Sequence, residues 1–142
     1  MSADFDLERF VAAQAPVYAD ALTELRAGRK RTHWMWFVFP QLAGLGASPT
    51  SQYFAIRSRK EAEAYLRHPI LGPRLREASA AALTSGRTAE AVFGYPDHLK
   101  FRSSMTLFAE IDPPELVFGE ALRRLCGGEA DPRTIEGLQR LA

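Results

Sequence analysis

The sequence has one cysteine, Cys126, among its 142 residues. A single cysteine cannot form a disulfide within the chain, which excludes the class of small secreted proteins that disulfides hold together. The three histidines are widely spaced and form no zinc-binding pattern, so we predict neither a metal nor a cofactor. Cys126 ends an apolar stripe, where an unreactive buried thiol is the expected state.

Long apolar runs and an excess of charge are also missing. The densest apolar stretch, residues 34–39, is far too short to cross a bilayer. The chain starts with acidic residues where a signal peptide would be basic, so we expect a cytoplasmic protein that does not insert into a membrane. The 18 Lys and Arg residues nearly balance the 17 Asp and Glu residues, which leaves a net charge of +1. No overall field therefore attracts nucleic acid, and an anionic ligand needs a local cluster of cations.

What the sequence has is the composition of one folded domain, which we predict to span residues 1–142. Hydrophobic residues make up 46% of the chain and charged residues 25%, enough for a core and a solvated surface. Apolar residues recur at helical spacing, and strands with a period of two are not indicated. We therefore predict an all-α fold, a compact single-domain bundle of about seven to eight short helices.

Proline, glycine and short polar residues mark where the helices begin and end. Pro16 lacks a backbone N–H, so it predicts a kink or a break in the first helix. Ser48, which a proline follows, and Ser58, which opens a capping box, predict two helix starts. Thr32 is predicted to cap a short helix. The remaining spacing predicts helices at residues 7–27, 33–39, 71–86, 88–93, 97–112, 117–125 and 132–141.

Residues 31–41 form an unusual aromatic segment with a polar residue near each end. Its apolar members are predicted to lie in the core: Met35, Phe37, Val38 and Phe39. His33 and Gln41 lie where the predicted short helix meets loops, so we expect them to line a pocket together with one tryptophan. On a helix, Trp36 would share a face with His33, and Trp34 would share a face with Gln41.

Four cations occupy six positions directly before this segment: Arg26, Arg29, Lys30 and Arg31. A helix N-terminus has unpaired N–H groups and a partial positive charge, so cations there disfavour the helix unless an anion is also present. We therefore predict a phosphate or carboxylate bound near Lys30 and Arg31. The alternative is a solvated basic turn whose charge Glu24 or Asp20 compensates.

A second candidate segment, residues 44–51, combines a flexible backbone with three hydroxyls and a predicted helix start. Gly44, Gly46 and Ser48 are the residues that a phosphate cradle in this segment would use. The ending of a Walker loop and the spacing of a dinucleotide-binding motif are both missing. An ordinary helix cap is therefore the alternative interpretation.

Residues 97–106 form a third candidate segment on a predicted helix. One strip of that helix carries a cation and two hydroxyls: Lys100, Ser103 and Ser104. With Arg102 on another face, this combination suits an anionic or sugar-like ligand, whereas serines inside helices also bond back to the preceding turn. Gln14 lies on an apolar stripe, where its amide is either a structural bridge or a ligand contact.

Several stretches along the chain combine aromatic and polar residues in long and chemically unusual motifs: residues 10–14, 28–30, 33–41, 44–46, 53–56, 65–69, 71–75, 93–94 and 100–108. Together they resemble, almost from end to end, the family of bacterial and fungal proteins called domain of unknown function 1810 (DUF1810). The resemblance implies a compact, mainly helical fold. It implies no established activity, so it supplies no catalytic residues. Where we expect a bulky aromatic residue before the paired glycines, this chain has Cys126, which argues further against a nucleophilic thiol.

The first functional hypothesis is a small enzyme or binding protein for a phosphorylated, nucleotide-like ligand. A loose analogy in site chemistry with small helical proteins that process ADP-ribose names ADP-ribose or an NAD-derived N-glycoside as the ligand type. In this hypothesis four cations hold phosphate: Lys30, Arg31, Lys100 and Arg102. Trp34 or Trp36 stacks on a base or sugar. Polar side chains contact hydroxyls of the ligand: Gln14, Gln41, Ser103 and Ser104. His33 is the predicted catalytic acid or base. The hypothesis requires three segments to meet in one cleft: the aromatic segment with the cations before it, residues 44–51 and residues 97–106.

The second hypothesis is a non-catalytic protein-interaction module. In that case the aromatic helix is core, the basic turn docks an acidic partner, and the three segments need not converge. A third hypothesis, binding of single-stranded nucleic acid through exposed Trp and Arg, is disfavoured by the near-zero net charge. The sequence leaves the oligomeric state open.

Overall fold

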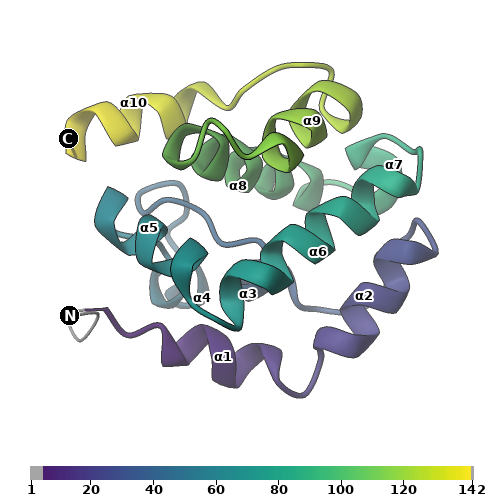
Figure 1. Ribbon diagram of the computed structural model, residues 1–142, viewed down its shortest axis with the longest axis horizontal. Helices are drawn as coiled ribbons and strands as arrows, with labels where there is room; N and C mark the ends of the chain where they lie inside the picture. Colours follow the sequence, from purple (N-terminus) through teal and green to yellow (C-terminus); the bar gives the residue numbers. More distant parts are fainter. Residues whose placement is uncertain (1–4, 142) are drawn as a thin grey trace.

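The computed structural model describes residues 5–141 of the chain. This part contains ten α-helices and no strand, which confirms the all-α prediction with slightly more helices than the seven to eight expected (Figure 1). The helices are α1 (Glu8–Gln14), α2 (Tyr18–Arg26), α3 (Met35–Val38), α4 (Pro49–Tyr53), α5 (Arg59–Arg67), α6 (Leu71–Thr84), α7 (Ala89–Phe93), α8 (Asp97–Ile111), α9 (Leu116–Leu125) and α10 (Pro132–Leu141). The longest, α8, has 15 residues, and within residues 5–141 no helix is both long and apolar enough to cross a membrane.

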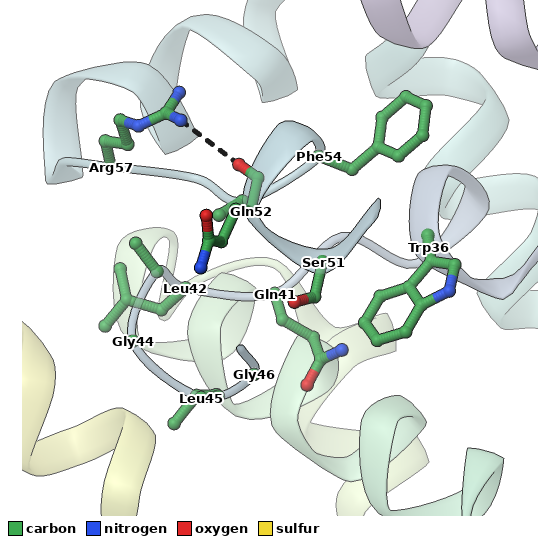
Figure 2. A pocket seen from close by; sticks show the side chains of 12 residues that line it. Trp36, Gln41, Leu42, Gly44, Leu45, Gly46, Ser51, Gln52, Phe54 and Arg57 are labelled. Atoms are coloured by element: carbon green, nitrogen blue, oxygen red, sulfur yellow. Dashed lines mark hydrogen bonds between the residues drawn. The ribbon is translucent and has the colours of Figure 1, made fainter. Parts of the chain in front are cut away.

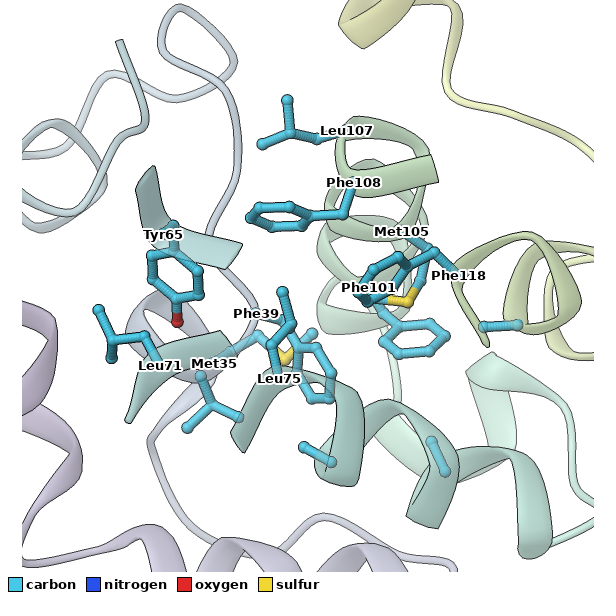
Figure 3. Packing of buried hydrophobic residues seen from close by; sticks show 14 of the residues in the cluster. Met35, Phe39, Tyr65, Leu71, Leu75, Phe101, Met105, Leu107, Phe108 and Phe118 are labelled. Atoms are coloured by element: carbon cyan, nitrogen blue, oxygen red, sulfur yellow. The ribbon is translucent and has the colours of Figure 1, made fainter. Parts of the chain in front are cut away.

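Helix α8 lies at the centre of the fold, where it packs against α3, α5, α7, α9 and α10 (Figure 1). Helix α6 packs against α2, α5 and α9, and so links the N-terminal helices to the others. Side chains from these elements form a continuous hydrophobic cluster, part of which Figure 3 displays: Met35, Phe39, Tyr65, Leu71, Leu75, Phe101, Met105, Leu107, Phe108 and Phe118. Because removing this apolar surface from water drives folding, the cluster holds α8 firmly in place.

Short polar side chains begin two helices as predicted. The Ser48 hydroxyl accepts a hydrogen bond from the Ser51 amide at 3.1 Å and begins α4. The Ser58 hydroxyl accepts one from the Glu61 amide at 3.0 Å and begins α5. Pro16 lies between α1 and α2, so the predicted first helix is broken into two at this residue. These local signals therefore set the helix boundaries correctly.

The predicted cap at Thr32 is wrong. Helix α3 begins at Met35 and has only four residues. The Thr32 amide and hydroxyl instead donate hydrogen bonds to the carboxylate of Glu24, at 3.0 and 2.6 Å. A helix of about one turn cannot present the two faces that a helix over residues 33–39 would have. Trp34 therefore precedes α3 and Trp36 lies within it, so the two tryptophans do not lie on two faces of one helix as predicted.

Backbone hydrogen bonds hold the loop between α3 and α4 against the segment before α5. The Ile56 amide donates to the Gln41 carbonyl and the Ala43 amide donates to the Ile56 carbonyl, both at 2.8 Å. The pairing forms an isolated parallel bridge between Leu42 and Ile56. Gln41 therefore has a fixed backbone at the point where the loop leaves the core.

A buried ion pair supports the same segment from the other side. Nη2 of Arg9 in α1 lies 3.0 Å from Oε2 of Glu61 in α5, and both side chains are almost fully buried. The Arg9 guanidinium also donates to the backbone carbonyls of Tyr53 at 2.7 Å and Ala55 at 2.9 Å. One side chain thus connects α1, the end of α4 and α5.

Candidate functional site

A cleft lies between the start of α8, the loop that follows α3 and the residues around the start of α10. These parts of the chain all contribute to its lining: Trp36, Gln41, Leu45, Gly46, Pro96, Leu99, Lys100, Arg102, Ser103, Asp131 and Arg133. Its volume of about 350 Å³ is sufficient for a small ligand. All three segments that the sequence singled out therefore contribute residues to one cleft.

A smaller hollow of about 160 Å³ adjoins the cleft, because Trp36, Gln41 and Gly46 line both. In Figure 2 the Gln41 side chain extends toward the Trp36 indole, and the loop that carries Gly44 and Gly46 lies on the other side of Gln41. Gly44 has a φ of 96°, which residues with side chains rarely adopt. A Cβ atom at Gly46 would lie only 2.8 Å from Oγ of Ser51. The two glycines therefore allow the backbone itself to form a wall of the site.

Lys100 is held over the Trp36 ring. Its Nζ lies 4.1 Å from the ring centroid and 3.0 Å from Oδ1 of Asp97. The other oxygen of Asp97 lies 2.9 Å from Nζ of Lys30, a predicted ligand-binding residue that does not line the cleft. Burial raises the pKa of Asp97, but the hydrogen bonds and charges of the two lysines outweigh it and lower the pKa below its ordinary value. One carboxylate serves two cations, so net positive charge remains beside the cleft.

Arg102 brings an unsatisfied guanidinium to the cleft. Its side chain is only 26% exposed, and Nε is buried with no hydrogen-bond partner among residues 5–141. The nearest carboxylates, on Glu129 and Asp131, lie at 3.6 and 3.8 Å, which is too far for a hydrogen bond. Buried polar groups are normally paired, and a guanidinium can bind two phosphate or carboxylate oxygens at once. Arg102 is therefore suited to bind an anion.

Asp131 and Arg133 also line the cleft, although no sequence motif predicts them as site residues. Oδ2 of Asp131 accepts a hydrogen bond from the Thr134 hydroxyl at 2.6 Å, and Oγ1 of Thr134 lies 3.1 Å from Oγ of Ser103. Nη2 of Arg133 donates to the Gly44 carbonyl at 3.4 Å, which joins α10 to the loop. The local signal at Asp131, an Asp-Pro pair, predicts a helix start and contains no information about contacts with α8.

Three predicted ligand-binding residues lie in the interior and do not line the cleft. The Gln14 amide nitrogen donates to a backbone carbonyl at 2.7 Å and to the Tyr65 hydroxyl at 3.1 Å, as its structural alternative requires. Trp34 is 1% exposed, and its Nε1 donates to Glu24 at 2.9 Å. Ser104 is fully buried, and its Oγ has no hydrogen-bond partner in the described part of the chain.

Three other predicted residues are exposed to solvent and also lie outside the cleft lining: Arg31, His33 and Ser48. The Ser48 side chain caps α4. The residues on either side of His33 reach the start of α8, because Lys30 binds Asp97 and Trp36 contacts Lys100. The segment that carries His33 therefore lies beside α8, but the imidazole itself is not part of the cleft. The catalytic role of His33 stays a prediction.

The anion at the basic turn is a carboxylate of this chain. Glu24 accepts hydrogen bonds from the amides of Arg31 and Thr32, from the Thr32 hydroxyl and from the Trp34 indole. Burial raises the pKa of Glu24, but these hydrogen bonds outweigh it and lower the pKa from 4.5 to about 2. The backbone at this turn is thus paired without an external ligand.

Replacing Glu24 by Gln should destabilise the protein in a pH-dependent way. Because folding lowers the pKa of Glu24, its contribution to stability is complete above about pH 4.5 and is lost as the pH falls toward 2. We expect a loss of about 1 kcal/mol at pH 7, since the carboxylate is partly open to solvent. Urea unfolding of wild type and variant at pH 7, 4 and 2.5 measures the difference.

The matched control is Glu110→Gln, an exposed carboxylate near the end of α8. Its effect on the free energy of unfolding should be small at all three pH values. A Glu24→Gln loss that stays constant down to pH 2.5 would contradict the assigned hydrogen bonds.

Comparison with known proteins identifies relatives over nearly the whole chain. The model of a family described as protein of unknown function (DUF1810) matches residues 4–138. Among solved structures, the chain is similar to the conserved hypothetical protein Rv1873 from Mycobacterium tuberculosis, with 53% sequence identity and a TM-score of 0.93. That similarity covers 96% of this chain and 98% of the other. No curated protein matches the chain.

Proposed function

This chain belongs to the DUF1810 family, and we propose that it is a cytosolic protein that binds a phosphorylated, nucleotide-like ligand in the cleft. ADP-ribose and other NAD-derived molecules are the ligand type that we expect. The observation that carries the proposal is the guanidinium of Arg102, which lines the cleft, is largely buried and lies beyond hydrogen-bond distance of both neighbouring carboxylates. An anion in the cleft would supply acceptors for the terminal nitrogens of this guanidinium.

Phosphate is the anion that suits this charge distribution. Among residues 5–141, three cations line the cleft, Lys100, Arg102 and Arg133, against the single carboxylate of Asp131. Lys100 shares its carboxylate partner with a second lysine, so its charge is only partly compensated. A phosphate group can accept two hydrogen bonds from Arg102 while Lys100 contributes as a point charge.

A planar group would fit beside the phosphate. Trp36, Pro96 and Leu99 give the cleft an apolar end near the start of α8, and Leu99 is 41% exposed. Nζ of Lys100 lies 4.1 Å from the centroid of the Trp36 ring, so a ring stacked on Trp36 and a phosphate held by Lys100 would be close neighbours. The indole of Trp36 offers a stacking surface of the kind that nucleobases use. This two-ended lining supports a nucleotide-like ligand over inorganic phosphate alone.

The proposal is limited to binding, because the predicted acid or base, His33, does not line the cleft. The alternative hypothesis, docking of an acidic partner on the basic turn, has less support. Glu24 already occupies the amides of that turn, and Lys30 already binds Asp97. A partner that bound these amides or Lys30 would have to compete with both carboxylates.

Binding of ADP-ribose should raise the stability of the protein, by about 2.7 kcal/mol when the ligand is present at 100 times its dissociation constant. Arg102→Gln and Lys100→Gln should each weaken binding about tenfold or more, because each removes a charge-assisted contact with phosphate. Thermal unfolding with ADP-ribose, NAD, AMP and pyrophosphate identifies the ligand, and calorimetric titration then measures the dissociation constants.

Arg124→Gln is the matched control. Arg124 is an exposed cation on α9 and does not line the cleft, so its loss should leave affinity within about twofold. If none of the four compounds stabilises the wild-type protein, the proposal is wrong. Equal weakening by Arg102→Gln and Arg124→Gln would show non-specific charge attraction in place of a site.

A further inference from the structure

The cleft that we propose binds an anion also contains a negatively charged group, the carboxylate of Asp131. Its side chain is only 12% exposed, and it lines the cleft together with three cations. Oδ1 lies 3.8 Å from Nη2 of Arg102 and accepts no hydrogen bond from a residue in the range 5–141. One oxygen of a largely buried carboxylate therefore has free acceptor capacity at the cleft.

The position of this carboxylate is determined by long-range contacts. The Asp131 amide donates to Oγ1 of Thr106 in α8 at 2.9 Å, and the Thr134 hydroxyl donates to Oδ2 at 2.6 Å. Because the Thr134 hydroxyl has a single hydrogen, it must in turn accept from the Ser103 hydroxyl, 3.1 Å away. A chain of hydroxyls thus fixes the side chain.

Capping of α10 does not account for the Asp131 side chain. A capping carboxylate accepts hydrogen bonds from backbone amides in the first turn of its helix. Here the Thr134 amide donates to the backbone carbonyl of Asp131, at 3.2 Å, and within the described residues no amide donates to the carboxylate. Oδ1 is therefore available to a ligand in the cleft.

A carboxylate next to a phosphate site repels a ligand that offers only phosphate oxygens. It favours a ligand that also presents a hydrogen-bond donor at that point. The hydroxyls of a ribose are such donors, and acidic side chains hold ribose hydroxyls in dinucleotide-binding folds. The arrangement of Asp131 beside Arg102 matches a ligand in which a hydroxyl and a phosphate lie close together.

We propose that Asp131 determines the specificity of the cleft: its free oxygen accepts a hydrogen bond from a ribose hydroxyl, so that the cleft selects ribose phosphates over simple phosphates. This inference rests on the proposed function, because it assumes that Arg102 and Lys100 hold the phosphate. It adds the second recognition element and names the part of the ligand that this element contacts.

Asp131→Asn tests the role of the carboxylate through the sign of its effect. Asn keeps the size of the side chain and can still accept from Thr134, but it presents an amide N–H₂ where Oδ1 was. If Asp131 binds a hydroxyl, ADP-ribose should bind about tenfold more weakly, which is the expected loss for a hydrogen bond to a charged group. If Asp131 is only a repelling charge, the same variant should bind ADP-ribose more tightly.

Glu129→Gln is the matched charge control. Glu129 lies 3.6 Å from the same guanidinium, but its side chain is 78% exposed and does not line the cleft. Its loss should leave the affinity for ADP-ribose within about twofold. Asp131→Ser serves as a second variant where Asn reduces the thermal stability, and it should give the same loss.

Calorimetric titration with ADP-ribose and with pyrophosphate separates the two proposals. The inference predicts that Asp131→Asn weakens ADP-ribose and leaves pyrophosphate unchanged or tighter. Unchanged or tighter binding of ADP-ribose would overturn it. Wild-type protein that binds pyrophosphate but not ADP-ribose also overturns it and leaves the anion site standing, whereas binding of none of the four compounds, ADP-ribose, NAD, AMP and pyrophosphate, overturns the proposed function as well.

Discussion

Replacing Glu61 by Gln is expected to lower the free energy of unfolding by about 3–5 kcal/mol. The side chains of Arg9 and Glu61 are only 4% and 5% exposed, so the substitution leaves a buried guanidinium without its counter-charge. The loss is large because the charge of Arg9 was removed from water during folding and then has only neutral acceptors. Urea unfolding at pH 7, followed by circular dichroism, measures it.

The matched control is Glu136→Gln, which removes a carboxylate from an ion pair on the surface of α10. Glu136 and Arg140 are 70% and 69% exposed, so their interaction is screened by solvent. Its loss should be about 0.5 kcal/mol or less. A Glu61→Gln loss of the same small size would contradict the burial of the Arg9 pair.

The effect of Glu61→Gln should extend to the candidate site. Arg9 holds the carbonyl of Ala55, and the next residue, Ile56, pairs with the backbone of Gln41. Gln41 lines both the cleft and the adjoining hollow. Loosening of the Arg9 contacts should therefore increase amide hydrogen exchange at Ile56 more than in the middle of α8.

The fold was predictable because its signals are local. Helical spacing of apolar residues, the break at Pro16 and the caps at Ser48 and Ser58 all act within one or two helical turns. The failure at Thr32 has a physical cause that local patterns do not contain. Its amide and hydroxyl bind Glu24 in α2, and so they are not available to begin α3.

The candidate site was only partly predictable, because tertiary contacts select among residues of the same type. The helical spacing predicted that Trp34 shares a face with Gln41, but Trp36 is the tryptophan that lines the cleft with Gln41. Trp34 precedes the short α3 in a non-helical conformation, with φ −147° and ψ 6°, and is buried where its indole can bind Glu24. Asp131 was missed for the same reason, since its partner Thr106 lies in α8.

Phe39→Ala is expected to destabilise the protein by about 3–5 kcal/mol, because it opens a cavity at a fully buried position. The Phe39 ring packs edge-on against Phe93 and Phe101, with centroid distances of 5.7 and 5.1 Å. These neighbours belong to α7 and α8, so a collapse of the cavity would have to move helices that many other contacts hold. Urea unfolding at pH 7 measures the loss.

Trp36→Ala, only three residues earlier, should give the opposite pattern. Trp36 is half-buried and its ring contacts Lys100, so its removal should cost only about 1–2 kcal/mol of stability. If its indole stacks on the ligand, affinity for ADP-ribose should fall about tenfold or more. Calorimetric titration of Trp36→Ala, with the conservative Phe39→Leu as the control that should keep wild-type affinity, tests the division of this segment into core and site. Wild-type affinity in Trp36→Ala would remove the stacking surface from the proposed function, and a Phe39→Ala loss below that of Trp36→Ala would contradict the assignment of Phe39 to the core.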